Sequence, residues 1–175
     1  MTLRLLVAGL IGSLLLAGCG HDQEEAGVDD SGAVLRQQRL DVRARAVDLL
    51  DHAERRLSGT TTQSSGRYDG CDSTFNDEFR TFNYVAQARV DSDQVAGADE
   101  LAGVLADAGF EAGDPTPGPG GRTSVKGTRD GLTAVLAVVA DNPWVLVSVT
   151  GPCIEVPENQ RQSWLDRKEP SPHLR

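Results

Sequence analysis

Several residue types are scarce in this chain of 175 residues, and their scarcity argues against several classes of function. Lysine occurs twice, histidine three times, and aromatic residues make up 5%. Basic residues form no cluster, and the formal net charge is −9. Because binding to nucleic acid depends on a basic footprint, the sequence argues against a nucleic-acid partner. Sugar sites usually need aromatic platforms, so the low aromatic content argues against glycoside cleavage.

The three histidines give little support for catalysis or metal binding. His21 and His173 lie in the terminal segments, and His52 lies on the flank of an expected helix. None has a nucleophile or metal ligand near it in sequence, and no G-x-S-x-G turn is present. A hydrolase therefore stays a minor alternative, because it needs folding to bring His52 to a Ser, Asp or Glu. We expect a non-enzymatic protein without a cofactor or metal.

Two segments share single features with known ligand-binding loops. The glycines at 118, 120 and 121 are not followed by Gly-Lys-Ser/Thr, so no nucleotide loop is expected. The segment 69–78 carries oxygen ligands that suit calcium, but their spacing matches no EF-hand loop. We favour a solvated acidic loop and keep a calcium site as the alternative. The ligand types concerned are Asp69, Asp72, Asn76, Asp77 and Glu78.

The only long apolar run stands at the start of the chain. Arg4 precedes the twelve apolar residues 5–16, and the small pair Ala17-Gly18 follows. This order is typical of a secretory signal, and the run is short for a transmembrane helix, which needs about 20 residues. No stop-transfer pattern follows. We therefore expect residues 1–18 to be a signal peptide.

The residues Leu16-Ala17-Gly18-Cys19 resemble the lipobox of bacterial lipoproteins. This resemblance implies that Cys19 carries lipid with acyl chains such as palmitate, and that cleavage occurs before Cys19. It also implies a location on the extracytoplasmic side of the cell membrane. The alternative is an ordinary cleaved signal with a chance cysteine. The composition, rich in Ala, Gly, Val, Arg and Asp, is similar to that of proteins from high-GC bacteria such as actinomycetes.

The segment 19–32 then consists of the lipidated cysteine and an acidic linker. Residues 20–32 contain five acidic residues and neither lysine nor arginine. A flexible chain of this length averages roughly 20 Å from end to end. Without residues 1–18 the chain has 16 basic and 26 acidic residues, a charge of −10. We expect the charge of the linker to keep the domain away from anionic lipid.

With Cys19 assigned to lipid, Cys71 and Cys153 remain. An exported protein meets an oxidising compartment, so we expect these two residues to form a disulfide. It would close a loop of about 83 residues and contribute roughly 4 to 5 kcal/mol in the chain-entropy model. A metal site or a catalytic thiol is the less favoured alternative, because no histidine lies near either cysteine.

Residues 33–156 are sufficient for one core, followed by a tail at 157–175. Apolar residues at helical spacing predict a helix over 33–57. Side chains that alternate with a period of two predict a half-buried strand over 82–90. A second helix is predicted over 94–109, with loops at 58–70 and 111–121. The first stripe consists of Leu35, Val42, Ala46, Leu49, Ala53 and Leu57, and the second of Val95, Leu101, Val104, Leu105 and Ala108.

Three strand-like runs follow at 122–129, 132–140 and 144–151. Asp130-Gly131 predicts a type I′ hairpin between the first two, which places Val125 opposite Leu136. A four-residue loop at 140–143 then turns the next strand so that its valines face the core. Those valines are Val145, Val147 and Val149.

The predicted fold is α+β, with a four-stranded, mostly antiparallel sheet and two helices on one face. The element order is helix, strand, helix, strand, strand, strand. The outer face then carries Val135, Val139, Trp144 and Leu146, more apolar surface than solubility requires. A tail that folds Trp164 and Leu165 onto this face is the first explanation. A partner surface is the second, and a wrong register is the third.

These patterns together predict a membrane-anchored, non-enzymatic binding or accessory domain of the cell envelope. The partner would be an envelope protein or another envelope component, bound through the outer sheet face or the 111–121 loop. The alternative is a carrier or sensor for a small apolar ligand between helices and sheet. A cavity lined by Tyr84, Leu136 and Val138 would favour that alternative.

Overall fold

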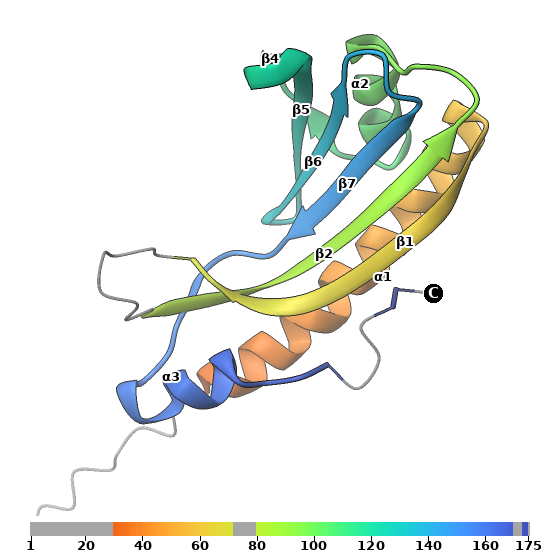
Figure 1. Cartoon of the computed structure of the whole chain (residues 1–175). Helices are drawn as coiled ribbons and strands as arrows, with labels where there is room; N and C mark the ends of the chain where they lie inside the picture. Colours follow the sequence, from red (N-terminus) through yellow and green to blue (C-terminus); the bar gives the residue numbers. More distant parts are fainter. Residues whose placement is uncertain (1–29, 72–79, 170–172, 175) are drawn as a thin grey trace, which may run out of the picture.

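The computed structural model describes residues 30–71, 80–169 and 173–174. Within these ranges the chain forms three α-helices and one open antiparallel sheet of eight strands (Figure 1). The α+β prediction is confirmed, but four strands and two helices are too few. The elements are α1 (Ser31–Leu57), β1 (Gly59–Gly70), β2 (Thr81–Ser92), α2 (Ala98–Asp107), β3 (Glu111–Ala112), β4 (Thr116–Pro117), a 3₁₀ turn (Pro119–Gly121), β5 (Arg122–Arg129), β6 (Leu132–Val139), β7 (Trp144–Thr150), β8 (Ile154–Glu155) and α3 (Glu158–Leu165).

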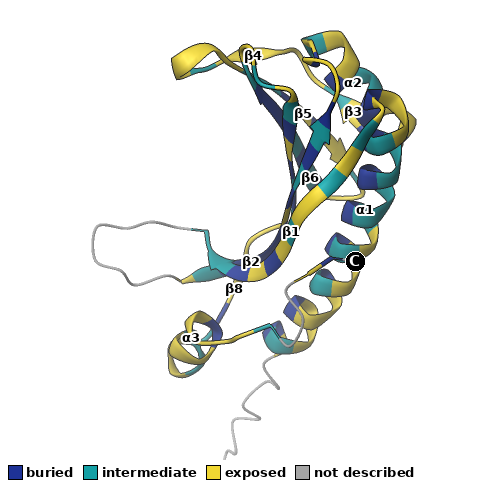
Figure 2. Cartoon of the chain, turned by 45° about the vertical axis from the view of Figure 1, so that its right-hand side comes forward, coloured by how far each residue is buried: buried dark blue, intermediate teal, exposed yellow. Residues whose placement is uncertain are grey.

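The sheet has helices on one face and a concave surface on the other. Its strand order is β1-β2-β7-β6-β5-β3, with β4 beside β5 and β8 beside β2. Helix α1 packs on β2 and β7, and α2 packs on β5 and β6. Figure 2 shows the sheet curving away from α1, so that its outer face forms the hollow side. The two-layer arrangement thus leaves this hollow face uncovered by α1 and α2.

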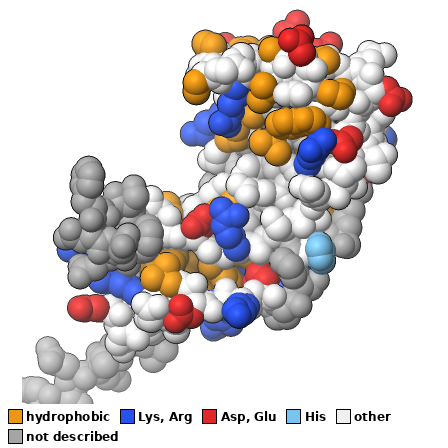
Figure 3. Space-filling model, viewed as in Figure 1, with side chains coloured by type: hydrophobic (Ala, Val, Ile, Leu, Met, Phe, Trp, Pro, Cys, Tyr) orange, Lys and Arg blue, Asp and Glu red, His pale blue; other side chains and the backbone are white. Residues whose placement is uncertain are grey.

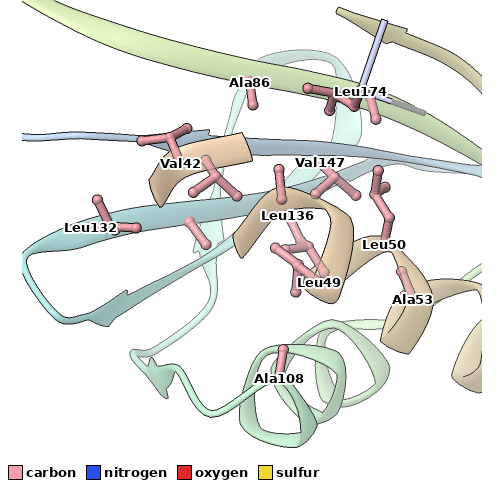
Figure 4. Close-up of a cluster of buried hydrophobic side chains, with 14 of the residues drawn as sticks. Val42, Leu49, Leu50, Ala53, Ala86, Ala108, Leu132, Leu136, Val147 and Leu174 are labelled. Atoms are coloured by element: carbon pink, nitrogen blue, oxygen red, sulfur yellow. The ribbon is translucent and has the colours of Figure 1, made fainter. Parts of the chain in front are cut away.

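The core lies between α1, α2 and the inner face of the sheet. All six residues of the predicted α1 stripe are buried, because their helical spacing puts them on one side of the helix. Figure 4 shows Leu49 of α1 close to Leu136 of β6, and both side chains are 0% exposed. The helix begins two residues before the predicted start and ends where Ser58 adopts a left-handed conformation with φ of 49°.

The predicted register of the last three long strands is confirmed. Asp130 and Gly131 have φ angles of 51° and 77°, as a type I′ turn requires. Val125 pairs with Leu136, and Leu136 pairs with Val147 across the four-residue loop. The valines of β7 therefore face the core, each at most 3% exposed.

The prediction of a loop over 58–70 is wrong, because this segment forms the edge strand β1. It pairs with β2 from Gly59 to Gly70, with one irregularity between Thr61 and Gln63. Before Tyr68 its inward positions, such as Ser64 and Gly66, hold small residues, so the segment shows no apolar alternation. At Gly66 an added Cβ would overlap the Tyr84 hydroxyl. The Tyr84 side chain from β2 thus fills the space that a side chain of β1 would normally occupy.

Two other segments differ from prediction in extent. Helix α2 is shorter than 94–109, and Val95 lies outside it and is 53% exposed, whereas Leu101, Val104, Leu105 and Ala108 are buried as predicted. The segment 111–121 is a loop only in part, because β3 and β4 both pair with β5. Backbone hydrogen bonds thus hold it against the sheet.

The described part of the tail packs on the helix side of the sheet and not on the outer face. Trp164 of α3 is 3% exposed, and its ring centroid lies 4.8 Å from that of Tyr68. Tyr68 pairs with the buried Tyr84 and shares its inward direction. Leu165 is 43% exposed. The first explanation for the apolar outer face, a cover formed by Trp164 and Leu165, is therefore wrong.

Cys71 and Cys153 form the predicted disulfide, with their Cα atoms 6.1 Å apart. Cys71 follows β1, and its amide donates a hydrogen bond to Thr81 at the start of β2. Cys153 follows β7 and precedes β8, so the bond joins these elements at one end of the sheet. In the described ranges, none of the helices combines the length and apolar character needed to cross a membrane.

Candidate binding surface

A pocket of about 410 Å³ lies on the hollow outer face of the sheet. Five strands contribute to it, which requires that β1, β2, β7, β6 and β5 lie side by side. Figure 3 shows hydrophobic side chains gathered over the upper part of this face, with basic side chains on both sides. The lining residues are Gln63, Ser64, Ser65, Gln87, Ala88, Arg89, Arg122, Val135, Ala137, Leu146, Val147 and Ser148.

The centre of the pocket is apolar. Ala137 of β6 pairs with Leu146 of β7, and Val135 pairs with Ser148. Ala137 is only 3% exposed although it lies on the outer face, whereas Leu146 is 46% exposed. A small residue beside a large protruding one produces a hollow next to an apolar ridge. Such a surface can take up an apolar side chain of a partner.

The rim of the pocket carries positive charge and no carboxylate. Arg89 lies 5.2 Å over the Trp144 ring and donates a hydrogen bond of 2.5 Å to Asp91, which is outside the lining. Arg122 is exposed and forms no ion pair within the described part of the chain. In a chain with a net charge of −9, the uncompensated charge of Arg122 at this rim favours an anionic partner.

Polar side chains of β1 and β2 complete the opposite wall. Arg67 donates a hydrogen bond of 3.1 Å to Oε1 of Gln87. Because that bond uses the acceptor of the amide, the two N–H groups of Gln87 remain as donors. Gln63 and Ser65 stand beside it on β1. The wall can therefore donate hydrogen bonds to the same anionic or carbonyl groups that the arginines attract.

The four residues predicted as a partner surface share this face, but only two of them line the pocket. Val135 and Leu146 line it. Val139 pairs with Arg122, and Trp144 pairs with Asp91, which places both at the adjacent strand ends. The contributions of β1 and β2 were not predicted, because β1 was expected to be a loop. The β-branched run 60–62 was the available signal for that strand.

The other candidate residues do not come together in a site within the described residues. His52 lies 3.8 Å from Asp48 on the same helix, and no serine hydroxyl is hydrogen-bonded to it in the described ranges. Asp69 pairs with Arg67, whereas Asp72, Asn76, Asp77 and Glu78 of the acidic segment lie outside those ranges. No group of three or more His, Cys, Asp or Glu side chains suits a metal ion there. Tyr84, Leu136 and Val138 pack in the core and do not line the outer pocket.

Comparisons with known proteins give one distant likeness of fold. No protein-family model and no curated protein matches the chain. A crystal structure of LppA from Mycobacterium tuberculosis, described as a putative lipoprotein, is similar over 77% of this chain and 82% of that chain, at 12% sequence identity and a TM-score of 0.37. At this TM-score the likeness carries no argument about function.

Proposed function

We propose that the protein is an extracytoplasmic lipoprotein that is held on the membrane by lipid at Cys19 and binds a partner on the hollow outer face of its sheet. The pocket on that face is the observation that carries this proposal. Its volume lies within the range of specific binding sites, and α1, α2 and the described part of the tail leave it open. The domain is non-enzymatic and needs no cofactor or metal for this role.

The lining indicates what the partner presents. An apolar centre beside Leu146 fits an apolar side chain, and the rim with Arg89 and Arg122 fits carboxylates on either side of it. An acidic segment of an envelope protein with one exposed apolar residue has this chemistry. An uncharged apolar ligand would leave the Arg122 guanidinium without a partner, so the carrier alternative is less favoured.

Site-specific photocrosslinking in intact cells tests the proposed surface. A photoreactive residue at position 146 should give a discrete crosslinked species. The same probe at Val95 is a matched control, because Val95 is a similarly exposed apolar residue away from the pocket. Arg122→Glu should remove the adduct at 146, since it reverses a charge of the rim. Adducts that are equal at both positions, or that survive Arg122→Glu unchanged, would contradict the proposal.

The anchor is tested independently of the binding surface. Cys19→Ala should move the protein from the membrane fraction to the soluble extracytoplasmic fraction, because a lipid-modified cysteine is then missing. Cys71→Ala serves as the control, since it also removes a cysteine but leaves Cys19 in place. A Cys19→Ala variant that still needs detergent for extraction would rule out this anchor.

A further inference from the structure

A second pocket, of about 360 Å³, lies where the first turns of α1 meet the segment that follows α3. It has an unusual concentration of positive charge for an acidic chain. Four cations and one carboxylate line it beside the Tyr68 ring. They are Arg36 and Arg39 of α1, and Arg167, Lys168 and Glu169 after α3.

The single carboxylate of this pocket is already neutralised. Oε2 of Glu169 accepts a hydrogen bond of 2.7 Å from Nε of Arg39, and the Glu169 side chain is 5% exposed. Arg36 and Lys168 are exposed and form no ion pair within the described residues. Asp166 is hydrogen-bonded to Gln162 and does not line the pocket. Three positive charges, those of Arg36, Arg167 and Lys168, therefore remain uncompensated at one small hollow.

Neighbouring groups hold two of the arginines in position and leave room for a third. The Arg167 guanidinium lies 4.6 Å over the Trp164 ring and 5.7 Å over the Tyr68 ring. Arg39 is fixed by Glu169. At Gly32 an added Cβ would lie 3.3 Å from Nη1 of Arg36, so a glycine here lets the Arg36 side chain lie close to the helix. Cations that are held before binding lose less conformational entropy when an anion arrives.

We infer that this pocket binds a phosphate group, of the kind that a phospholipid head group or a soluble phosphoester carries. Guanidinium groups offer paired N–H donors that match the oxygens of phosphate, and an ammonium group adds a mobile point charge. A carboxylate ligand would use fewer of these donors, because it has two oxygens where a phosphate has more. The pocket is separate from the outer-face pocket and shares no lining residue with it.

The position of this phosphate pocket would determine how the domain is oriented on the membrane. Arg36 lies five residues after Ser31, the first residue of α1, and Ser31 lies twelve residues after Cys19. In Figure 1, α3 lies at the bottom, and β5, β6 and β7 lie at the top. Head-group binding would thus hold the lower end on the lipid, against the repulsion expected of the acidic linker, and would place the apolar upper part of the outer face far from the membrane. This consequence rests on the proposed anchor, whereas phosphate binding itself does not.

Two probes test the inference on the exported chain, residues 19–175, with Cys19→Ser so that lipidation does not contribute. The first is flotation with vesicles of equal parts phosphatidylglycerol and phosphatidylcholine, compared with vesicles of phosphatidylcholine alone. The second is NMR titration with inorganic phosphate. The double variant Arg36→Gln/Lys168→Gln should weaken binding about tenfold, which corresponds to about 1.4 kcal/mol. The control Arg55→Gln/Lys126→Gln removes the same charge at exposed sites outside this pocket.

The outcomes separate the two sources of phosphate. Binding to the anionic vesicles that inorganic phosphate reduces, and that only the pocket variant loses, supports a lipid head group. Binding of inorganic phosphate at Arg36 without vesicle binding supports a soluble phosphoester. Equal losses in the pocket and control variants, or no binding of either probe, would overturn the inference. None of these results depends on the crosslinking at position 146.

Discussion

Arg39 in α1 and Glu169 after α3 form a short ion pair that joins positions 130 residues apart. The Tyr84 hydroxyl lies 3.3 Å from the same Oε2 atom, and a guanidinium nitrogen of Arg43 lies 4.0 Å from it. One buried carboxylate thus joins the segment after α3 to both α1 and β2. Loss of its charge would weaken these hydrogen bonds and leave the Arg39 guanidinium without its counter-ion.

Glu169→Gln should lower the free energy of unfolding by about 1 to 3 kcal/mol, because hydrogen bonds to a charged group become weaker bonds to a neutral amide while the Arg39 charge stays partly buried. Chemical denaturation at neutral pH measures the change. Asp166→Asn is the matched control, since that carboxylate is exposed and its loss should cost at most about 0.5 kcal/mol. A cost for Glu169→Gln no greater than for Asp166→Asn would show that the ion pair does not stabilise the fold.

The two tyrosines of the chain, Tyr68 and Tyr84, should both ionise at a higher pH than a solvent-exposed tyrosine. Burial raises the pKa of each phenol above its ordinary value of 10.0, although Arg167 beside Tyr68 and Arg43 beside Tyr84 partly oppose the shift. Since the folded state keeps its phenol protons longer than the unfolded state, stability should hold below pH 10.0 and fall as the pH rises through the raised pKa values.

Absorbance at the tyrosinate band reports both residues, because the chain has no other tyrosine. Folded protein should titrate at higher pH than protein in denaturant. Tyr68→Phe should leave one raised transition and reduce the loss of stability in alkali. A folded titration curve that coincides with the denatured one would contradict the burial argument for both rings.

The elements that could be predicted from sequence are those whose pattern is local. The stripe from Leu35 to Leu57 repeats at helical spacing, and Asp130-Gly131 fixes the pairing of β5 with β6. Strand β1 has no such pattern, because its inward residues are small where the Tyr84 ring covers them. Its strand conformation depends on pairing with β2, which begins at Thr81, and this pairing is a tertiary contact that no local pattern predicts.

Only half of the candidate binding surface could be predicted from the sequence, because the other half also depends on tertiary contacts. The register of the last three strands placed Val135 and Leu146 on one face. The other half needed the knowledge that β2 lies beside β7, which brings Gln87 and Arg89 next to Leu146. No local sequence pattern indicates whether β2 pairs with β7 or with β5, the two edge strands of the unit β5-β6-β7. The expected disulfide between Cys71 and Cys153 favours the β7 edge, because it ties the segment before β2 to the segment after β7.

Gly66→Ala should lower the free energy of unfolding by about 1 to 3 kcal/mol, which is typical of an overpacked core. The new Cβ would overlap the Tyr84 hydroxyl, and the ring carbon that bears it would lie 2.7 Å away. Thermal or chemical unfolding measures the loss. Gly118→Ala is the control, because its Cβ would meet nothing closer than 3.5 Å. Equal stability of the two variants would show that the Tyr84 ring can move aside without cost.

Removal of the disulfide by Cys71→Ser/Cys153→Ser should lower the free energy of unfolding by at most about 4 to 5 kcal/mol, since the unfolded chain regains the freedom of a loop of about 83 residues. In the folded state, the loss of amide protection should be greatest near the two cysteines. Amide protection at Thr81 and Phe82, where β8 pairs with β2, should fall more than at Val125 and Leu136. Cys19→Ser is the control and should change neither quantity. A double variant as stable as the parent would mean that pairing of β2 with β7 and β8 alone fixes this end of the sheet.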